Sequence, residues 1–133
     1  MSIRVLVVDD VADLRRIFRI VLEADGRFEI VGEAGDGEEA VQLAEELRPD
    51  VIVLDLAMPR MDGISAIPFL HRASPGVRIL VLSGFESRQL AQRAIAACAT
   101  AFLSKGTLPD EIASTLHDVY LSPPKEVCGT SAA

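Results

Sequence analysis

Short apolar runs alternate along the chain with longer segments in which apolar residues recur every three or four positions. Several of the short runs are rich in valine and isoleucine, which is typical of strands buried on both faces of a parallel sheet. The runs are Ile3–Val8, Phe28–Val31, Val51–Leu54, Val77–Leu82 and Ala101–Leu103. They predict five short strands.

The segments between these runs carry apolar stripes at helical spacing, which predicts five amphipathic helices. The stripes are Leu14, Ile17, Phe18, Val21 and Leu22; Ala40, Leu43, Ala44 and Leu47; Ile64, Ile67 and Leu70; Leu90, Ala91, Ala94 and Ile95; and Ile112, Leu116, Val119 and Tyr120. The third segment contains Pro68, which has no backbone N–H to donate. We therefore expect a kink or a late start in that helix.

Strand–helix alternation repeated five times predicts an α/β domain with a parallel sheet covered on both faces. The 133 residues are enough for one such domain and too few for two. We expect this domain to span residues 1–121 and the small-residue segment 122–133 to be a flexible tail. Ligands of such sheets bind at the carboxyl ends of the strands, so the residues that follow each strand are the candidates for chemistry.

Acidic, hydroxyl and basic residues follow four of the five predicted strands. They are Asp9 and Asp10 after the first strand, Asp55 after the third, Ser83 after the fourth, and Ser104 and Lys105 after the fifth. Carboxylates at adjacent strand ends repel one another unless a cation neutralises them. Oxygen ligands without histidine suit magnesium, and a nearby hydroxyl and ammonium could receive an anionic group. The set indicates phosphoryl transfer.

Each of these residues also has an ordinary structural interpretation. An Asp-Asp pair before a helix usually caps it, a single aspartate after a strand usually belongs to a turn, and a lysine there is usually solvated. Arg15, Arg16 and Arg19 could form a docking face for a phosphodonor or simply a solvated face. The functional interpretation depends on all the site residues falling at strand ends of one α/β pattern.

The segments at 5–10, 50–63, 82–84 and 101–105 together resemble the receiver domains of two-component response regulators. The resemblance covers roughly residues 3–121, and segment 32–40 is most similar to the NarL-type subclass, whose members usually carry a DNA-binding domain after the receiver. It implies a doubly wound, five-stranded parallel sheet in the flavodoxin-like order 2-1-3-4-5, with helices on both faces.

The resemblance also implies a role for each acidic residue. Asp55 matches the phospho-acceptor, whose carboxylate attacks phosphorus. Asp10 and Asp55 match direct Mg²⁺ ligands, together with the backbone carbonyl of Ala57, and Asp9 matches a partner that acts largely through bound water. A long-lived phosphoryl group is expected, because Ala57 offers no group to orient water and Phe85 can cover part of the approach.

Three further residues complete the site that the resemblance implies. Lys105 matches the lysine that neutralises the phosphoryl oxygens, Ser83 the hydroxyl that moves onto the phosphate, and Phe102 the aromatic that packs inward after that movement. In most receivers this lysine precedes a proline, often through a cis bond, whereas here it precedes Gly106. The isomer of the Lys105–Gly106 bond is therefore open.

A chain of this kind would take a phosphoryl group from a sensor histidine kinase or a histidine phosphotransfer protein. It would then bind a downstream protein, or associate with itself, through the segments 90–95, 101–103 and 112–120. It would be a switch that catalyses its own phosphorylation and slow dephosphorylation, not a conventional enzyme. The alternatives are a receiver-like interaction module without phosphorylation, the excised receiver of a DNA-binding regulator, and a flavodoxin-like cofactor binder, for which no cofactor loop is found.

Composition limits the class of partner. Thirteen basic and twenty acidic residues give a net charge of −7, which disfavours nucleic acid as a partner of this chain alone. No apolar run approaches the ~18 residues that cross a membrane, and the first residues lack the pattern of a signal peptide, so we expect a cytoplasmic protein. Cys98 and Cys128 fit a reduced compartment better than a disulfide framework.

Overall fold

The computed structural model describes residues 2–56, 62–84 and 88–123. Five strands and five helices alternate strictly in this part of the chain, as the sequence pattern predicts. In chain order they are β1 (Ile3–Val8), α1 (Ala12–Asp25), β2 (Phe28–Ala34), α2 (Gly37–Leu47), β3 (Val51–Asp55), α3 (Gly63–Ala73), β4 (Arg78–Ser83), α4 (Arg88–Ala96), β5 (Ala101–Ser104) and α5 (Pro109–Leu121). None of the helices in the described ranges is long and apolar enough to cross a membrane.

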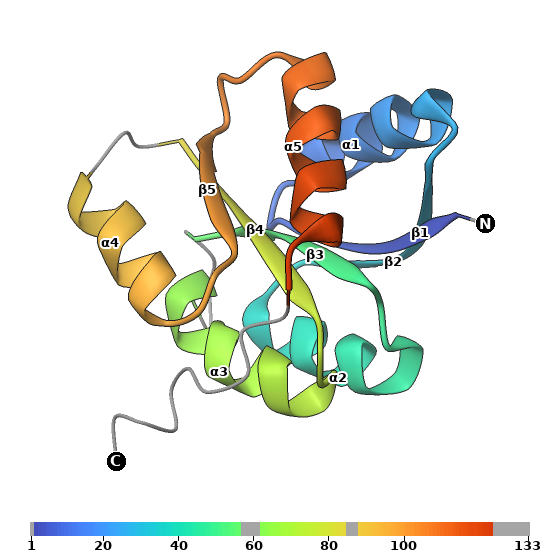
Figure 1. Ribbon diagram of the computed structural model, residues 1–133. Coiled ribbons are helices and arrows are strands. Elements are labelled where there is room, and N and C mark those ends of the chain that lie inside the picture. Colours follow the sequence, from blue (N-terminus) through green and yellow to red (C-terminus); the bar gives the residue numbers. More distant parts are fainter. Residues whose placement is uncertain (1, 57–61, 85–87, 124–133) are drawn as a thin grey trace.

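All strand pairs are parallel, and the sheet has the order β2-β1-β3-β4-β5, so the predicted fold is confirmed (Figure 1). Strand β2 is three residues longer than predicted, because Gly32, Glu33 and Ala34 continue the ladder opposite the end of β1. These residues interrupt the apolar run that marked the strand. The register between the two strands shifts after Val5.

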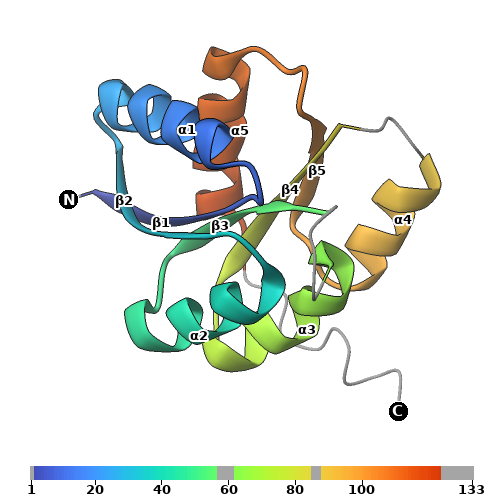
Figure 2. The same cartoon turned by 180° about the vertical axis from the view of Figure 1, so that it is seen from behind.

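Alternate residues of the strands enter two separate cores, because successive side chains point to opposite faces of a sheet. Leu6 and Val8 of β1 pack with buried residues of α2, α3 and α4, whereas Val5 and Val7 pack with α1 and α5. Figures 1 and 2 show the same division, with α1 and α5 on one face of the sheet and α2 and α3 on the other. The strands are therefore apolar on both faces, and polar groups gather at their ends.

The helices flanking the central strands begin at acidic caps. Asp36 accepts a hydrogen bond from Glu39 N at 2.9 Å at the start of α2, and Asp62 accepts one from Ser65 N at 2.8 Å at the start of α3. Such caps satisfy backbone donors that the first helical turn leaves unpaired. Helix α3 begins at Gly63 and continues through Pro68, so the helix does not start late. The other expectation, a kink at Pro68, stays a prediction.

Cys98 is buried and follows α4 in a turn with positive φ. It is disulfide-bonded in the structure, so the expectation of reduced cysteines is wrong for this residue. Cys128 lies outside the described residues.

Candidate functional site

The predicted site residues of three central strands meet at one edge of the sheet. Asp9 follows β1, Asp55 ends β3 and Ser83 ends β4. Val8 is aligned with Leu54 and Asp55 with Leu82, so the strands finish at nearly the same level. The backbone N–H of Asp9 donates to the carbonyl of Ala34 at 3.0 Å, which ties the residue to the end of β2.

Three carboxylates form a cluster at this edge. Oxygen atoms of Asp9, Asp10 and Asp55 all lie within 4.8 Å of one another. Asp9 and Asp55 are buried, with 2% and 4% of their surface exposed, whereas Asp10 is exposed. Carboxylates this close repel one another, and burial strengthens the repulsion, so the cluster favours a bound cation. The ligand atoms offered are all hard oxygens, a donor set that fits a cation such as Mg²⁺.

The two acids before α1 are not its N-cap. Val11 occupies that position and caps nothing with its side chain, while Asp9 Oδ1 accepts from the backbone N–H of Val11 at 2.9 Å. The Asp10 side chain makes no hydrogen bond or ion pair with the described residues. The capping interpretation of Asp9 and Asp10 is therefore wrong.

Lys105 reaches two of the three acids. Its Nζ lies 3.0 Å from Asp9 Oδ2 and 3.1 Å from Asp55 Oδ1. Burial lowers the pKa of Lys105, but its hydrogen bonds to Asp9 and Asp55, with their charges, outweigh burial and raise the pKa above 10.5. The lysine is therefore a fixed cation at neutral pH.

Ser83 lies on β4, the strand next to Asp55, and Phe102 lies on β5, the strand beyond it. Ser83 is buried at the end of β4 and aligned with Ser104, and its carbonyl accepts from the N–H of Lys105 at 2.8 Å. Phe102 is half-buried and packs against the core on the side of α2, α3 and α4. Both residues thus lie on strands that lead to the acidic cluster.

The turn after Lys105 is built on a glycine. No peptide bond is cis among the described residues, so the Lys105–Gly106 bond is trans. The N–H of Gly106 donates to Ser104 Oγ at 3.1 Å, a bond that proline could not make.

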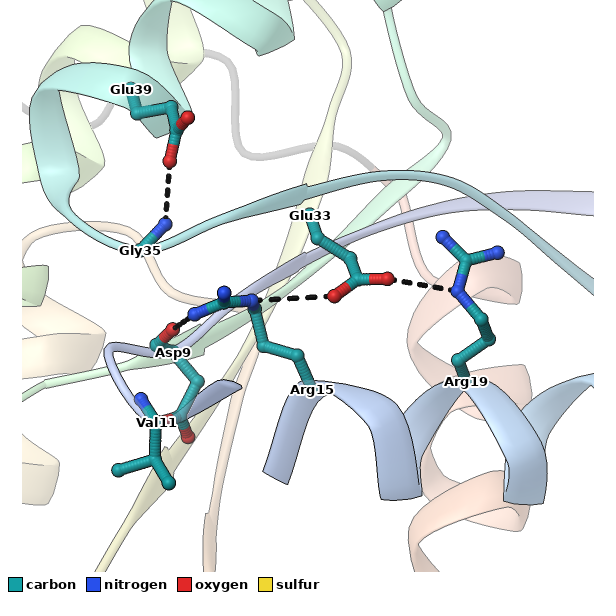
Figure 3. A network of polar contacts seen from close by, with 7 residues as sticks. All are labelled: Asp9, Val11, Arg15, Arg19, Glu33, Gly35 and Glu39. Carbon is teal, nitrogen blue, oxygen red and sulfur yellow. Dashed lines mark hydrogen bonds and ion pairs between the residues drawn. The ribbon is translucent and has the colours of Figure 1, made fainter. Parts of the chain in front are cut away.

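Two contacts at the site were not predicted from the sequence. Gly63 packs directly on the end of β3, since a Cβ at this position would lie 2.4 Å from the carbonyl oxygen of Asp55. Arg15 of α1 contacts the carbonyl of Asp9 and forms an ion pair with Glu33 (Figure 3). Neither contact could be read from local spacing in the sequence.

Two predicted contributors lie outside the described residues. Ala57 was expected to supply a carbonyl ligand, and Phe85 a cover over the phosphoryl group. Their roles stay predictions.

Residues 5–117 match the family model of the response regulator receiver domain. The chain belongs to this family. It is 36% identical over 119 residues to the chemotaxis protein CheY of Thermotoga maritima, which covers 90% of this chain and 98% of that protein. The receiver fold, the acidic cluster and the lysine are thus those of a signal-transduction domain.

Solved receiver structures agree with this assignment. The signal receiver domain of NarL from Mycobacterium tuberculosis superposes with a TM-score of 0.85 at 31% identity, covering 91% of this chain and 98% of that one. CheY in a CheX–CheY–BeF₃–Mg²⁺ complex from Borrelia burgdorferi gives a TM-score of 0.83 at 26% identity, with 90% of each chain covered. The receiver spans about half the length of several related transcriptional regulators and about a quarter of a related methylesterase.

Proposed function

We propose that this receiver accepts a phosphoryl group on Asp55 in a Mg²⁺-dependent reaction and thereby switches its binding to other proteins. The observation that carries the proposal is the placement of the buried Asp55 carboxylate. It lies within a cluster of three acids and 3.1 Å from the ammonium of Lys105. An acceptor needs this combination, because charge that moves onto the phosphoryl oxygens must be neutralised in place.

Asp9, Asp10 and Asp55 would hold the magnesium ion, with Asp10 and Asp55 as direct ligands and Asp9 acting largely through water. The carbonyl of Ala57 would complete the protein ligands. When bound, the ion neutralises the acids and the phosphoryl oxygens. All the side-chain donors are carboxylate oxygens, which support Mg²⁺ over metals that favour nitrogen or sulfur.

The side chains would divide the chemistry among them. An Asp55 oxygen attacks phosphorus, and an O–P bond forms as the P–N bond of the donor phosphohistidine breaks, with the electron pair remaining on the imidazole nitrogen. Lys105 neutralises the transferred oxygens. The Ser83 hydroxyl then moves onto the phosphoryl group and Phe102 packs inward, which gives the phosphorylated state its own free energy.

The same function implies partners for the receiver and a location in the cell. The donor would be a sensor histidine kinase or a histidine phosphotransfer protein. The output would be a downstream protein, or a second copy, bound at the surface of α4, β5 and α5. The chain would be a cytoplasmic switch that catalyses only its own phosphorylation and slow dephosphorylation, with residues 1–121 as the receiver and 122–133 as a tail. CheY from Borrelia burgdorferi, solved with CheX, BeF₃ and Mg²⁺, supports this view by similarity.

A receiver-like module that is never phosphorylated is the main competing function. The two differ in what small phosphodonors do to the protein. Acetyl phosphate or phosphoramidate with Mg²⁺ should add one phosphoryl group to the intact mass, and Asp55→Asn should remain unlabelled. Asp13→Asn is the matched control, because Asp13 is an exposed acid in the first turn of α1 outside the cluster. Equal labelling of Asp55→Asn, or none of the unchanged chain, would overturn the proposal.

A further inference from the structure

Arg15 joins the acidic loop to the neighbouring strand. Its Nη1 donates to the backbone carbonyl of Asp9, and its Nε lies 3.3 Å from Glu33 Oε1 on β2 (Figure 3). The Arg15 side chain is only 19% exposed. The two donors of one rigid guanidinium therefore act in two directions, one toward the loop and one toward the sheet.

Glu33 is itself held on its far side. Its second oxygen accepts from Arg19 Nε at 2.8 Å, and Arg19 also lies 3.7 Å from Glu23 on the same helix. The carboxylate of Glu33 is thus fixed between two arginines that lie one helical turn apart, as Figure 3 shows. Arg15 is therefore largely buried and not simply solvated, whereas a docking role of Arg15, Arg16 and Arg19 stays a prediction.

The loop that Arg15 touches carries two members of the acidic cluster. Asp9 is held through its N–H by Ala34 and through Oδ1 by Val11, and Arg15 holds its carbonyl. That carbonyl belongs to the peptide between Asp9 and Asp10. A contact that holds this peptide therefore restrains the backbone from which the exposed Asp10 side chain projects.

We propose that Arg15 is a positioning residue for divalent-cation binding, fixing the Asp9–Asp10 peptide from a guanidinium that Glu33 anchors to β2. The inference rests on the proposed function. Groups that orient metal ligands typically contribute about 10–100-fold to metal affinity. We expect about a tenfold loss of Mg²⁺ affinity when the contact to the Asp9 carbonyl is removed.

The sign of the change in Mg²⁺ affinity distinguishes a positioning role of Arg15 from an effect of its positive charge alone. Arg15 is a cation near a site for another cation, so Coulomb's law alone predicts that Arg15→Met binds Mg²⁺ more tightly. Positioning predicts weaker binding. Arg15→Lys keeps the charge but replaces the planar fork of Nε and Nη1, which faces two directions, by a single ammonium nitrogen. Charge alone therefore predicts no change, and positioning again predicts weaker binding.

Two neighbours on α1 supply controls. Arg19→Met removes an ion pair with Glu33 but no contact with Asp9. Arg16→Met removes an exposed charge that makes no hydrogen bond or ion pair with the described residues. Mg²⁺ titrations followed by the amide NMR signals of residues 9–11 give the affinity of each variant. Denaturant unfolding without Mg²⁺ gives its stability.

We expect weaker Mg²⁺ binding in Arg15→Met and Arg15→Lys, and affinities near that of the unchanged chain in both controls. The inference is overturned by unchanged or tighter binding in either Arg15 variant, or by an equal loss in Arg19→Met. If Arg15→Met does not fold, Arg15→Lys decides alone. A lack of Mg²⁺ binding by the unchanged chain would overturn the proposed function, and the inference with it.

Discussion

The ammonium of Lys105 lies 3.1 Å from Oδ1 of Asp55, and 3.0 Å from the second buried acid, Asp9. One cation thus faces a cluster of three carboxylates, so the charge of the group is 1 − 3 = −2 when all the acids are ionised. A divalent cation would balance this charge. The two neighbouring carboxylates account for the raised pKa of Lys105.

Lys105→Met should lower the free energy of unfolding at pH 7, by about 1–2 kcal/mol after allowance for solvent screening of a side chain that is 23% exposed. The pKa of Lys105 is raised in the folded protein. Its contribution to stability is therefore complete below the ordinary value of 10.5 and is lost as the pH rises through the folded pKa.

Urea unfolding between pH 7 and 11.5 checks this prediction. The difference between the unchanged chain and Lys105→Met should be constant to about pH 10 and should shrink above it. Arg16→Met serves as the control for loss of an exposed positive charge. If the difference in unfolding free energy between the two chains grew at high pH, the pKa of Lys105 would not be raised in the folded protein.

Mg²⁺ should stabilise the folded chain through the acidic cluster. At about ten times its dissociation constant, the ion should raise the free energy of unfolding by about 1.4 kcal/mol, since it binds only the folded state. Asp10→Asn should lose most of this gain, because it removes a proposed ligand, whereas Asp13→Asn should keep it. Thermal unfolding with and without Mg²⁺ measures the effect, and an equal gain in Asp10→Asn would place the ion elsewhere.

Gly63→Ala should lower the free energy of unfolding by more than a substitution at the first residue of a helix usually does. A Cβ at Gly63 would lie 2.4 Å from the carbonyl oxygen of Asp55 and 2.8 Å from Cα of Leu56, both backbone atoms that cannot move aside cheaply. Overpacking of this kind costs about 1–3 kcal/mol, and here it would also displace the acceptor.

Gly84→Ala provides the comparison, because a Cβ there meets nothing within 4 Å. We expect that variant to unfold within about 0.5 kcal/mol of the unchanged chain. Denaturant unfolding compares the two substitutions directly. Equal free energies of unfolding for Gly63→Ala and Gly84→Ala would show that the backbone near Asp55 can shift to make room for the added Cβ.

Beryllofluoride with Mg²⁺, as a stand-in for the phosphoryl group, should change hydrogen exchange at the surface of α4, β5 and α5. In the proposed switch, Ser83 and Phe102 would link the site to this surface, and β5 is an edge strand whose four residues are all only half-buried. Helix α2 should keep its protection and serves as the internal reference. Identical exchange on α4, β5 and α5 in both states would exclude a switch at this surface.

Much of the fold follows from the order of apolar and polar residues along the sequence. The strands are apolar on both faces because each is covered by helices on both faces, so valine and isoleucine runs mark them directly. Polar residues of the strands then gather at the strand ends. This is why the sequence alone predicts one site that contains Asp9, Asp55, Ser83 and Lys105. The length of β2 was underestimated, because the polar Glu33 ends the apolar run but not the hydrogen-bond ladder.

Only the tertiary structure decided which side chains these residues meet. Spacing could not show that Asp10 is unused as a cap, that Lys105 contacts Asp9 as closely as Asp55, or that Gly63 presses on the acceptor's backbone. Arg15 and Glu33 are 18 residues apart and meet because α1 packs beside β2. Hydrophobic periodicity encodes which face of an element is buried, whereas the partner of a polar side chain depends on strand register and helix packing, which exist only once the chain has folded.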